Sequence, residues 1–89
     1  METIIIDHAR ERMWERGVSE EDIYKTLSQG RPVHSKQGRF AKEYVFVYKK
    51  EWQGKFYPQK KVKAVYVEER GHKVVITVYA YYGIWEVEK

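Results

Sequence analysis

Three basic side chains follow one another at helical spacing near the start of the chain. His8, Arg12 and Arg16 are four residues apart, so in a helix they share one side with the apolar Ala9 and Met13. Guanidinium groups neutralise phosphate charge, and an imidazole can change its charge near neutral pH. One interpretation is an anion site where this helix meets a sheet. The other is that the arginines lie over the sheet edge or pair with nearby carboxylates.

Basic and aromatic residues gather in the middle of the chain. Residues 31–63 carry 10 Lys and Arg against 2 Asp and Glu, whereas the whole chain has a net charge of +4. An aromatic surface beside lysines suits unpaired bases, which stack while the lysines contact the backbone. The candidate nucleic-acid-binding residues are Lys49, Lys50, Lys55, Lys60, Lys61, Lys63, Tyr44, Tyr48 and Tyr66.

The same residues have a second interpretation that needs no nucleic acid. Lysines keep an exposed hairpin in solution and discourage pairing along a sheet edge. The tyrosines could instead form a second small core, or an interface with another copy of the chain or with a partner protein. The sequence leaves these alternatives open.

Composition excludes several kinds of site. The chain has no cysteine, so a disulfide, a thiolate nucleophile and a cysteine-based zinc site are excluded. His8, His34 and His72 lack metal-ligand spacing, and the sequence shows no P-loop, nucleophile elbow or carboxylate pair. We therefore expect no metal and no other cofactor.

The start of the chain lacks the basic residues and long apolar run of a signal peptide, and no segment has the length to span a bilayer. We therefore expect a cytoplasmic protein without a membrane partner. Asparagine is absent while lysine and glutamate are abundant, which is typical of a thermophilic source.

Two helices are predicted near the N-terminus. Asp7 suits the N-cap of a helix over 8–16, and Gly17 suits the left-handed residue that ends it. Residues 19–22 approximate a capping box for a second helix over 20–29. These elements place the three basic side chains on the first helix.

Strands follow the helices. We predict four strands in all, over residues 2–6, 39–50, 61–69 and 72–82. Residues 31–38 are polar and turn-like, whereas 51–60 form either a strand extension or an aromatic, basic contact loop.

This order predicts one α+β domain over residues 1–89, arranged β-α-α-β-β-β, with both helices on one face of a small antiparallel sheet. The sequence does not decide which face is buried. If the valine face of strand 39–50 meets the helices, its aromatic residues point outward.

A resemblance appears over residues 8–23, which contain H-A-x-x-R-M-x-E-R-G-V-S-x-x-D-I. This stretch resembles the opening of a widespread family of small, uncharacterised bacterial and archaeal domains. That family is similar in outline to the RelE and BrnT ribonuclease toxins of toxin–antitoxin pairs. The match covers residues 4–30 and, more loosely, the last strands.

The resemblance implies a RelE-like fold, RNA binding, metal-independent endoribonuclease activity on mRNA and an antitoxin protein that covers the cleft. It implies a basic and aromatic cleft rather than a fixed triad. Cleavage needs groups that move protons and groups that neutralise charge on phosphorus. The candidate catalytic residues are His8, Arg12, Arg16, His72, Tyr79 and Tyr81. The alternative is a non-catalytic module that binds nucleic acid or protein.

Overall fold

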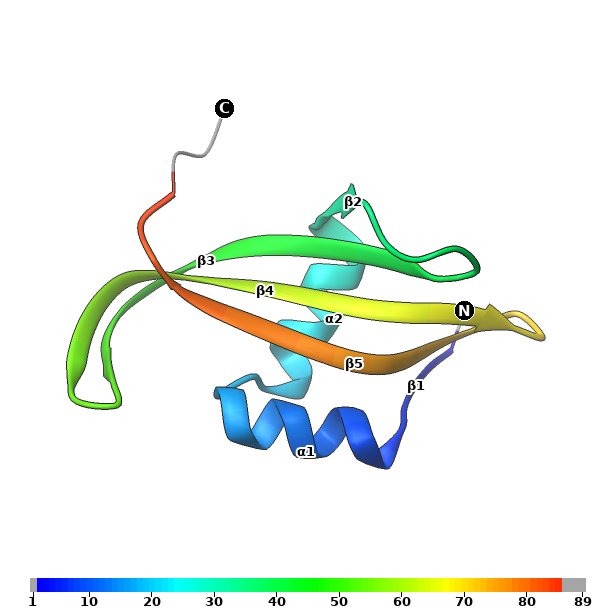
Figure 1. Ribbon diagram of the computed structural model, residues 1–89, viewed down its shortest axis with the longest axis horizontal. Coiled ribbons are helices and arrows are strands. Elements are labelled where there is room, and N and C mark those ends of the chain that lie inside the picture. The colour runs from blue at the N-terminus through cyan, green and yellow to red at the C-terminus, as the bar shows by residue number, and fades with distance from the viewer. Residues whose placement is uncertain (1, 86–89) are drawn as a thin grey trace.

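The computed structural model describes residues 2–85 and shows two helices against one face of a five-stranded sheet (Figure 1). The elements, in chain order, are β1 (Thr3–Ile5), α1 (Asp7–Arg16), α2 (Glu20–Gln29), β2 (Arg31–Val33), β3 (Phe40–Trp52), β4 (Lys55–Glu69) and β5 (His72–Gly83). The sheet order is β1-β5-β4-β3-β2. The predicted α+β class and its two helices are confirmed.

The sheet differs from the prediction in two ways. It is mixed, because β1 runs parallel to β5 while all other neighbours are antiparallel. It also has more strands than predicted, because residues 31–33 form β2 where a turn was expected. Three residues at the sheet edge pair with 41–43 of β3, and so short an edge strand carries little sequence signal.

The helix ends follow the sequence signals, with one correction. Asp7 was expected to cap α1, but Ile6 occupies that position and Asp7 is the first helical residue. Its carboxylate still lies at the positive end of the helix dipole. Gly17 adopts the predicted left-handed conformation with φ 70°, and the capping box joins Ser19 and Asp22 in both directions at 3.1 Å.

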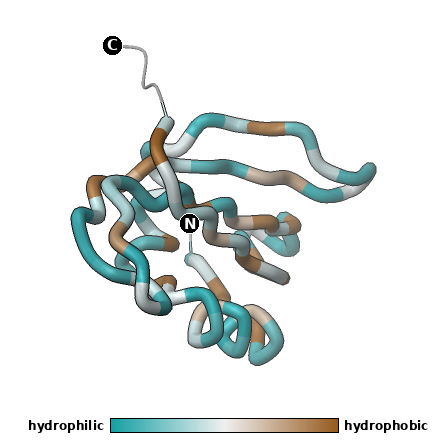
Figure 2. Tube along the Cα trace, turned by 60° about the vertical axis from the view of Figure 1, so that its left-hand side comes forward, coloured by the Kyte–Doolittle hydropathy of each residue, from teal (hydrophilic) through white to brown (hydrophobic). Residues whose placement is uncertain are grey.

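Each helix has ten residues, and no helix in the described part of the chain has the length and apolar character to cross a membrane. The two helices close the core against β4 and β5. Its buried members are Ile5, Ala9, Met13, Val18, Ile23, Leu27, Val62, Ala64, Tyr66, Val75 and Val78. Both the helices and the strands carry hydrophobic positions separated by hydrophilic stretches (Figure 2).

The aromatic face of β3 is the one that meets the helices. Phe46 packs against the core, Lys25 of α2 lies 5.6 Å from the Tyr44 ring, and Tyr48 contacts Tyr82 edge to face. Burying aromatic rings removes more apolar area from water than burying valines. Val47, at the next position, is 76% exposed.

β3 and β4 continue beyond the rest of the sheet as a hairpin, which we call the arm and define as residues 50–57 (Figure 1). The pairing register shifts between Val47 and Lys50, where Lys49 has φ 52°. Such a bulge bends a hairpin and increases its twist. The segment 51–60 is thus mainly strand, as one of the two predicted alternatives had it.

Gly30 is expected to be essential for the junction of α2 with β3. A Cβ there would lie 2.3 Å from the Thr26 carbonyl oxygen and 2.7 Å from that of Glu43, so the helix end and strand would have to separate. Gly30→Ala should lower the free energy of unfolding by about 1–3 kcal/mol in urea titrations. Gln29→Ala, at the exposed neighbouring position, should change it by less than about 0.5 kcal/mol. Equal unfolding midpoints for both variants would contradict the close approach.

Candidate functional site

Lysines and tyrosines project from the side of the sheet that carries no helix. In the register between β4 and β5, Lys61 lies opposite Tyr81 and Lys63 opposite Tyr79. The residue between the two lysines, Val62, is buried in the core, and the residue between the two tyrosines, Ala80, packs against that core. Because side chains alternate along a strand, the lysines and tyrosines face the opposite side.

We call Arg16, Lys61, Lys63, Tyr79 and Tyr81 the open-face cluster. Its two tyrosine rings lie within 13° of parallel, with centroids 6.5 Å apart. Tyr79 is 36% exposed and Tyr81 46% exposed. The Lys63 ammonium lies 5.8 Å from the Tyr79 centroid, and the Arg16 guanidinium carbon lies 4.9 Å from it. Cations therefore adjoin an exposed aromatic surface.

Arg16 reaches this cluster from the last turn of α1. Its guanidinium donates a hydrogen bond to the Val78 carbonyl, and its own carbonyl accepts one from the Tyr82 hydroxyl at 2.6 Å. β1 pairs with β5 only over 73–75, so Val78 lies on the part of the β5 edge beyond β1. Arg16 thus lies over a sheet edge, as one interpretation of the sequence had it.

Within the described residues, no carboxylate pairs with the cations of the cluster. Glu43 lies opposite Lys63 in the sheet, but its carboxylate accepts hydrogen bonds from Arg31 at 2.9 and 3.2 Å. Within residues 2–85, Arg16, Lys61 and Lys63 form no ion pair. Three cations on one surface attract anions.

The structure brings together three of the six candidate catalytic residues: Arg16, Tyr79 and Tyr81. His8 lies exposed in the first turn of α1, two turns and about 12 Å along the helix from Arg16. Arg12 pairs with Glu15.

His72 opens β5 beside the turn from β4. It lies seven residues from Tyr79, or about 23 Å along an extended strand. Within the described chain, its buried Nδ1 has no hydrogen-bond partner. The histidines therefore lie apart from the tyrosines.

The candidate nucleic-acid-binding residues divide among three places. Lys61 and Lys63 belong to the open-face cluster, and Lys49, Lys50 and Lys55 lie exposed on or beside the arm. The others lie on the helix-covered side. Of these, Tyr66 and Lys60 are each only 6% exposed, and burial raises the pKa of Tyr66. This third group faces away from the open-face cluster.

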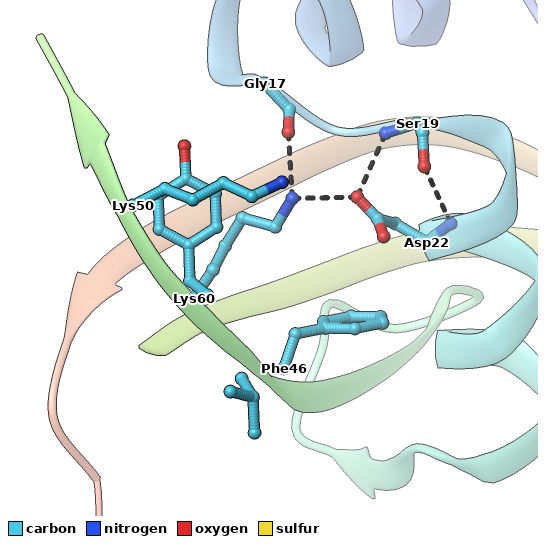
Figure 3. Close-up of a pocket in the computed structure, with 8 residues that line it drawn as sticks. Gly17, Ser19, Asp22, Phe46, Lys50 and Lys60 are labelled. Atoms are coloured by element: carbon cyan, nitrogen blue, oxygen red, sulfur yellow. Dashed lines mark hydrogen bonds and ion pairs between the residues drawn. The ribbon is translucent and has the colours of Figure 1, made fainter. Parts of the chain in front are cut away.

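Lys60 joins the helical turn to the sheet (Figure 3). Its ammonium donates to the Gly17 carbonyl at 2.9 Å and to the Asp22 carboxylate at 2.8 Å, and the same carboxylate oxygen accepts from the Ser19 N–H at 3.1 Å. Beside these groups lies an open groove of about 370 Å³, and the Lys50 side chain extends along it (Figure 3). The polar groups around Lys60 bond to one another, so their role is structural.

A second aromatic core holds the arm against the turn between the helices. Trp52 stacks on Tyr82 with ring centroids 4.9 Å apart and ring planes at 12°. The Tyr48 and Tyr57 rings also pack against Tyr82, with centroids 5.3 and 5.5 Å from its own. A Cβ on Gly17 would lie 2.7 Å from the Trp52 ring. One of the candidate nucleic-acid-binding tyrosines, Tyr48, belongs to this second core.

Sequence reasoning missed the structural roles of Lys60, Trp52 and Tyr82. One signal could have revealed the first: Lys60 and Lys61 are adjacent in a strand, so they must face opposite sides. No local pattern links Tyr82 to its hydrogen-bond partner Arg16, 66 residues away.

Lys60→Met should be strongly destabilising because it leaves the Asp22 carboxylate and the Gly17 carbonyl without their cation. Removing one member of a buried ion pair costs about 3 kcal/mol or more of unfolding free energy, measurable in urea. Adding Asp22→Asn should recover part of this loss, since the unpaired charge is then gone. Strictly additive losses in this double-mutant cycle would contradict direct coupling.

Alkaline stability should depend on Tyr82, because its burial raises its pKa to about 12. An unfolded tyrosine ionises near pH 10, so the folded state retains a proton that the unfolded state loses. This stabilising contribution is complete below about pH 10 and is lost as the pH rises through about 12. Tyr82→Phe should cost about 1 kcal/mol at neutral pH through its lost hydrogen bond. Between pH 10 and 12, unfolding free energy should then fall less steeply in the variant, and equal slopes would contradict this.

The chain was compared with known proteins. A family model described as "Domain of unknown function (DUF4258)" matches residues 5–80. No curated protein and no solved structure matches the chain, so the likeness to RelE and BrnT stays a prediction. The matched range begins at Ile5, the last residue of β1, and includes both helices, β2 to β4, and β5 as far as Ala80. The chain therefore belongs to the DUF4258 family of domains.

Proposed function

We propose that this domain binds single-stranded RNA through the open-face cluster. The observation that carries the proposal is the pair of exposed, nearly parallel rings of Tyr79 and Tyr81, flanked by cations. Aromatic faces stack unpaired bases, and each stacked base contributes about 1–3 kcal/mol. Lys61, Lys63 and Arg16 would contact the phosphates.

The arrangement favours a single strand over a duplex. Bases in a duplex are already stacked and paired, so their faces are closed to a tyrosine ring, whereas unpaired bases can turn outward. The lysines and tyrosines of the cluster also lie on one sheet face, on the neighbouring strands β4 and β5. A flexible strand can follow such a surface.

Binding is best measured by fluorescence anisotropy with a labelled oligouridine and the matching duplex, over a range of salt concentrations. Tyr79→Ala/Tyr81→Ala should weaken binding to the single strand at least tenfold, because stacking is lost. Lys61→Gln/Lys63→Gln should reduce the slope of log K against log salt by about 1.4, because two phosphate contacts are lost.

Matched controls come from the helix-covered side of the molecule. Tyr24→Ala and Lys25→Gln remove an exposed tyrosine and an exposed lysine from α2, and both should leave affinity unchanged. No binding at low salt, equal affinity for the duplex, or equal losses in the controls would contradict the proposed interface.

RNA cleavage is a second candidate function, favoured by the approach of Arg16 and Lys63 to Tyr79. The 2′-oxygen would attack the adjacent phosphorus while the 5′-oxygen leaves, giving a 2′,3′-cyclic phosphate and a 5′-hydroxyl. Arg16 and Lys63 would neutralise charge on the phosphorane, and a tyrosine hydroxyl would protonate the leaving oxygen. The 2′-hydroxyl would give its proton to water, because His8 and His72 lie elsewhere, and water would return a proton to the tyrosine.

Cleavage can be separated from binding with the Tyr79→Phe/Tyr81→Phe variant, which keeps both rings and lacks both hydroxyls. RNA incubated with the wild type in EDTA should give cyclic-phosphate products, and the variant should bind RNA without cleaving it. Intact RNA with a wild-type protein that binds would leave binding as the function. Cleavage would make the antitoxin partner implied by the RelE and BrnT resemblance worth seeking by co-purification.

A further inference from the structure

The chain continues past β5 with a further aromatic side chain, Trp85, which lies on the same side of the sheet as the open-face cluster. Its ring centroid is 4.9 Å from the Lys61 ammonium, and its backbone N–H donates a hydrogen bond to the Gln59 side chain. Gln59 and Lys61 flank the inward-facing Lys60 on β4. Because side chains alternate along a strand, both point to the side without helices, and Trp85 lies there with them.

Gly83 provides the space for the Trp85 ring. Position 83 lies two residues after Tyr81 on β5 and opposite Gln59 on β4, so a side chain there would project outward beside the tyrosines. A Cβ at this position would lie 3.5 Å from the Trp85 ring, which is ordinary van der Waals contact. The indole therefore covers the place into which a larger side chain would extend. Tyr79, Tyr81 and Trp85 thus form a row of three rings along one face.

Cations alternate with the rings of this row. The Lys63 ammonium lies 5.8 Å from the Tyr79 centroid, whereas Lys61 lies opposite Tyr81 in the register and against the Trp85 ring. A phosphate that joins bases stacked on Tyr81 and Trp85 would therefore lie near the Lys61 ammonium. Within residues 2–85, no carboxylate pairs with Lys61 and no other aromatic ring packs against Trp85.

We propose that Trp85 is a third base-stacking position, so that the open face holds three consecutive unpaired nucleotides with a phosphate on Lys61 between the second and the third. This inference rests on the proposed function and adds to it the length of the bound segment. Every base has a face that can stack on an aromatic ring. The third position therefore selects for the length of the strand rather than for its sequence.

Tryptophan fluorescence reports on the third position directly, because a base stacked on an indole quenches its emission. Titration with oligouridine should quench the emission of the wild type. Trp85→Phe should lose this quenching and still bind RNA, because a phenyl ring also stacks. Trp14→Phe is the matched control: Trp14 is 88% exposed on α1, away from the open face, so this variant should keep the quenching.

The length of the bound segment is measured by competition, in which unlabelled uridine oligonucleotides of two, three and four residues displace the labelled oligouridine. Affinity should rise at least about fivefold from two residues to three, because one more base stacks. The step from three residues to four should be smaller. Trp85→Ala should abolish the step from two to three, because the third ring is gone.

Gly83→Leu tests the position of the indole without removing it. The leucine side chain would overlap the ring and displace it, so this variant should lose both the quenching and the step from two residues to three. Gly83→Ala adds only a Cβ at ordinary contact distance and should keep both. Far-ultraviolet circular dichroism checks that each variant is folded.

The possible results separate this inference from the proposed function. A wild type that binds no RNA at low salt would overturn both. Binding that depends on Tyr79 and Tyr81 but leaves the tryptophan emission unchanged would overturn the third position alone. Equal quenching in the wild type and Trp85→Phe, or a length step that survives in Trp85→Ala, would do the same.

Discussion

The ammonium of Lys60 holds three parts of the chain at one point. It donates to the backbone carbonyl of Gly17, the residue that caps the C-terminus of α1, and to the side-chain carboxylate of Asp22 in the first turn of α2. The remaining donor direction faces the rings of Phe46 and Tyr48, whose centroids lie 5.9 and 5.5 Å away. A buried charge is tolerated only when its donors are used, so these bonds fix the helical turn over β4.

The inward position of Lys60 has a consequence for the outer face. Because side chains alternate along β4, burying Lys60 with Val62 and Ala64 forces Lys61 and Lys63 outward. If β4 shifted by one residue against its neighbours, its inward and outward side chains would exchange sides. Lys61 and Lys63 would then be buried without partners. The ion pair with Asp22 therefore helps to set the register that assembles the open-face cluster on the side without helices.

Sequence signals between neighbouring residues predicted the helices and most of the strands. They could not predict contacts between residues far apart in the chain. The capping box at Ser19 and the left-handed Gly17 depend on neighbouring residues, so both were visible in the sequence. The parallel pairing of β1 with β5 joins residues about 70 positions apart, which no periodicity records. Three of the six candidate catalytic residues lie apart from the cluster for the same reason, since spacing within α1 does not show that Arg16, rather than His8, reaches Tyr79.

Arg16 connects the two sides of the molecule. Its carbonyl is fixed by Tyr82 of the second aromatic core, and its guanidinium is fixed by the β5 edge beside Tyr79. Two anchors at opposite ends of one residue reduce the side-chain entropy that a ligand would otherwise have to remove. An anion arriving at the open face would therefore meet a guanidinium already held beside an exposed ring. The same bonds couple the arm to that face, since Tyr82 is also the residue on which Trp52 stacks. Displacing the arm would loosen the support of Arg16 and weaken any contact the guanidinium makes.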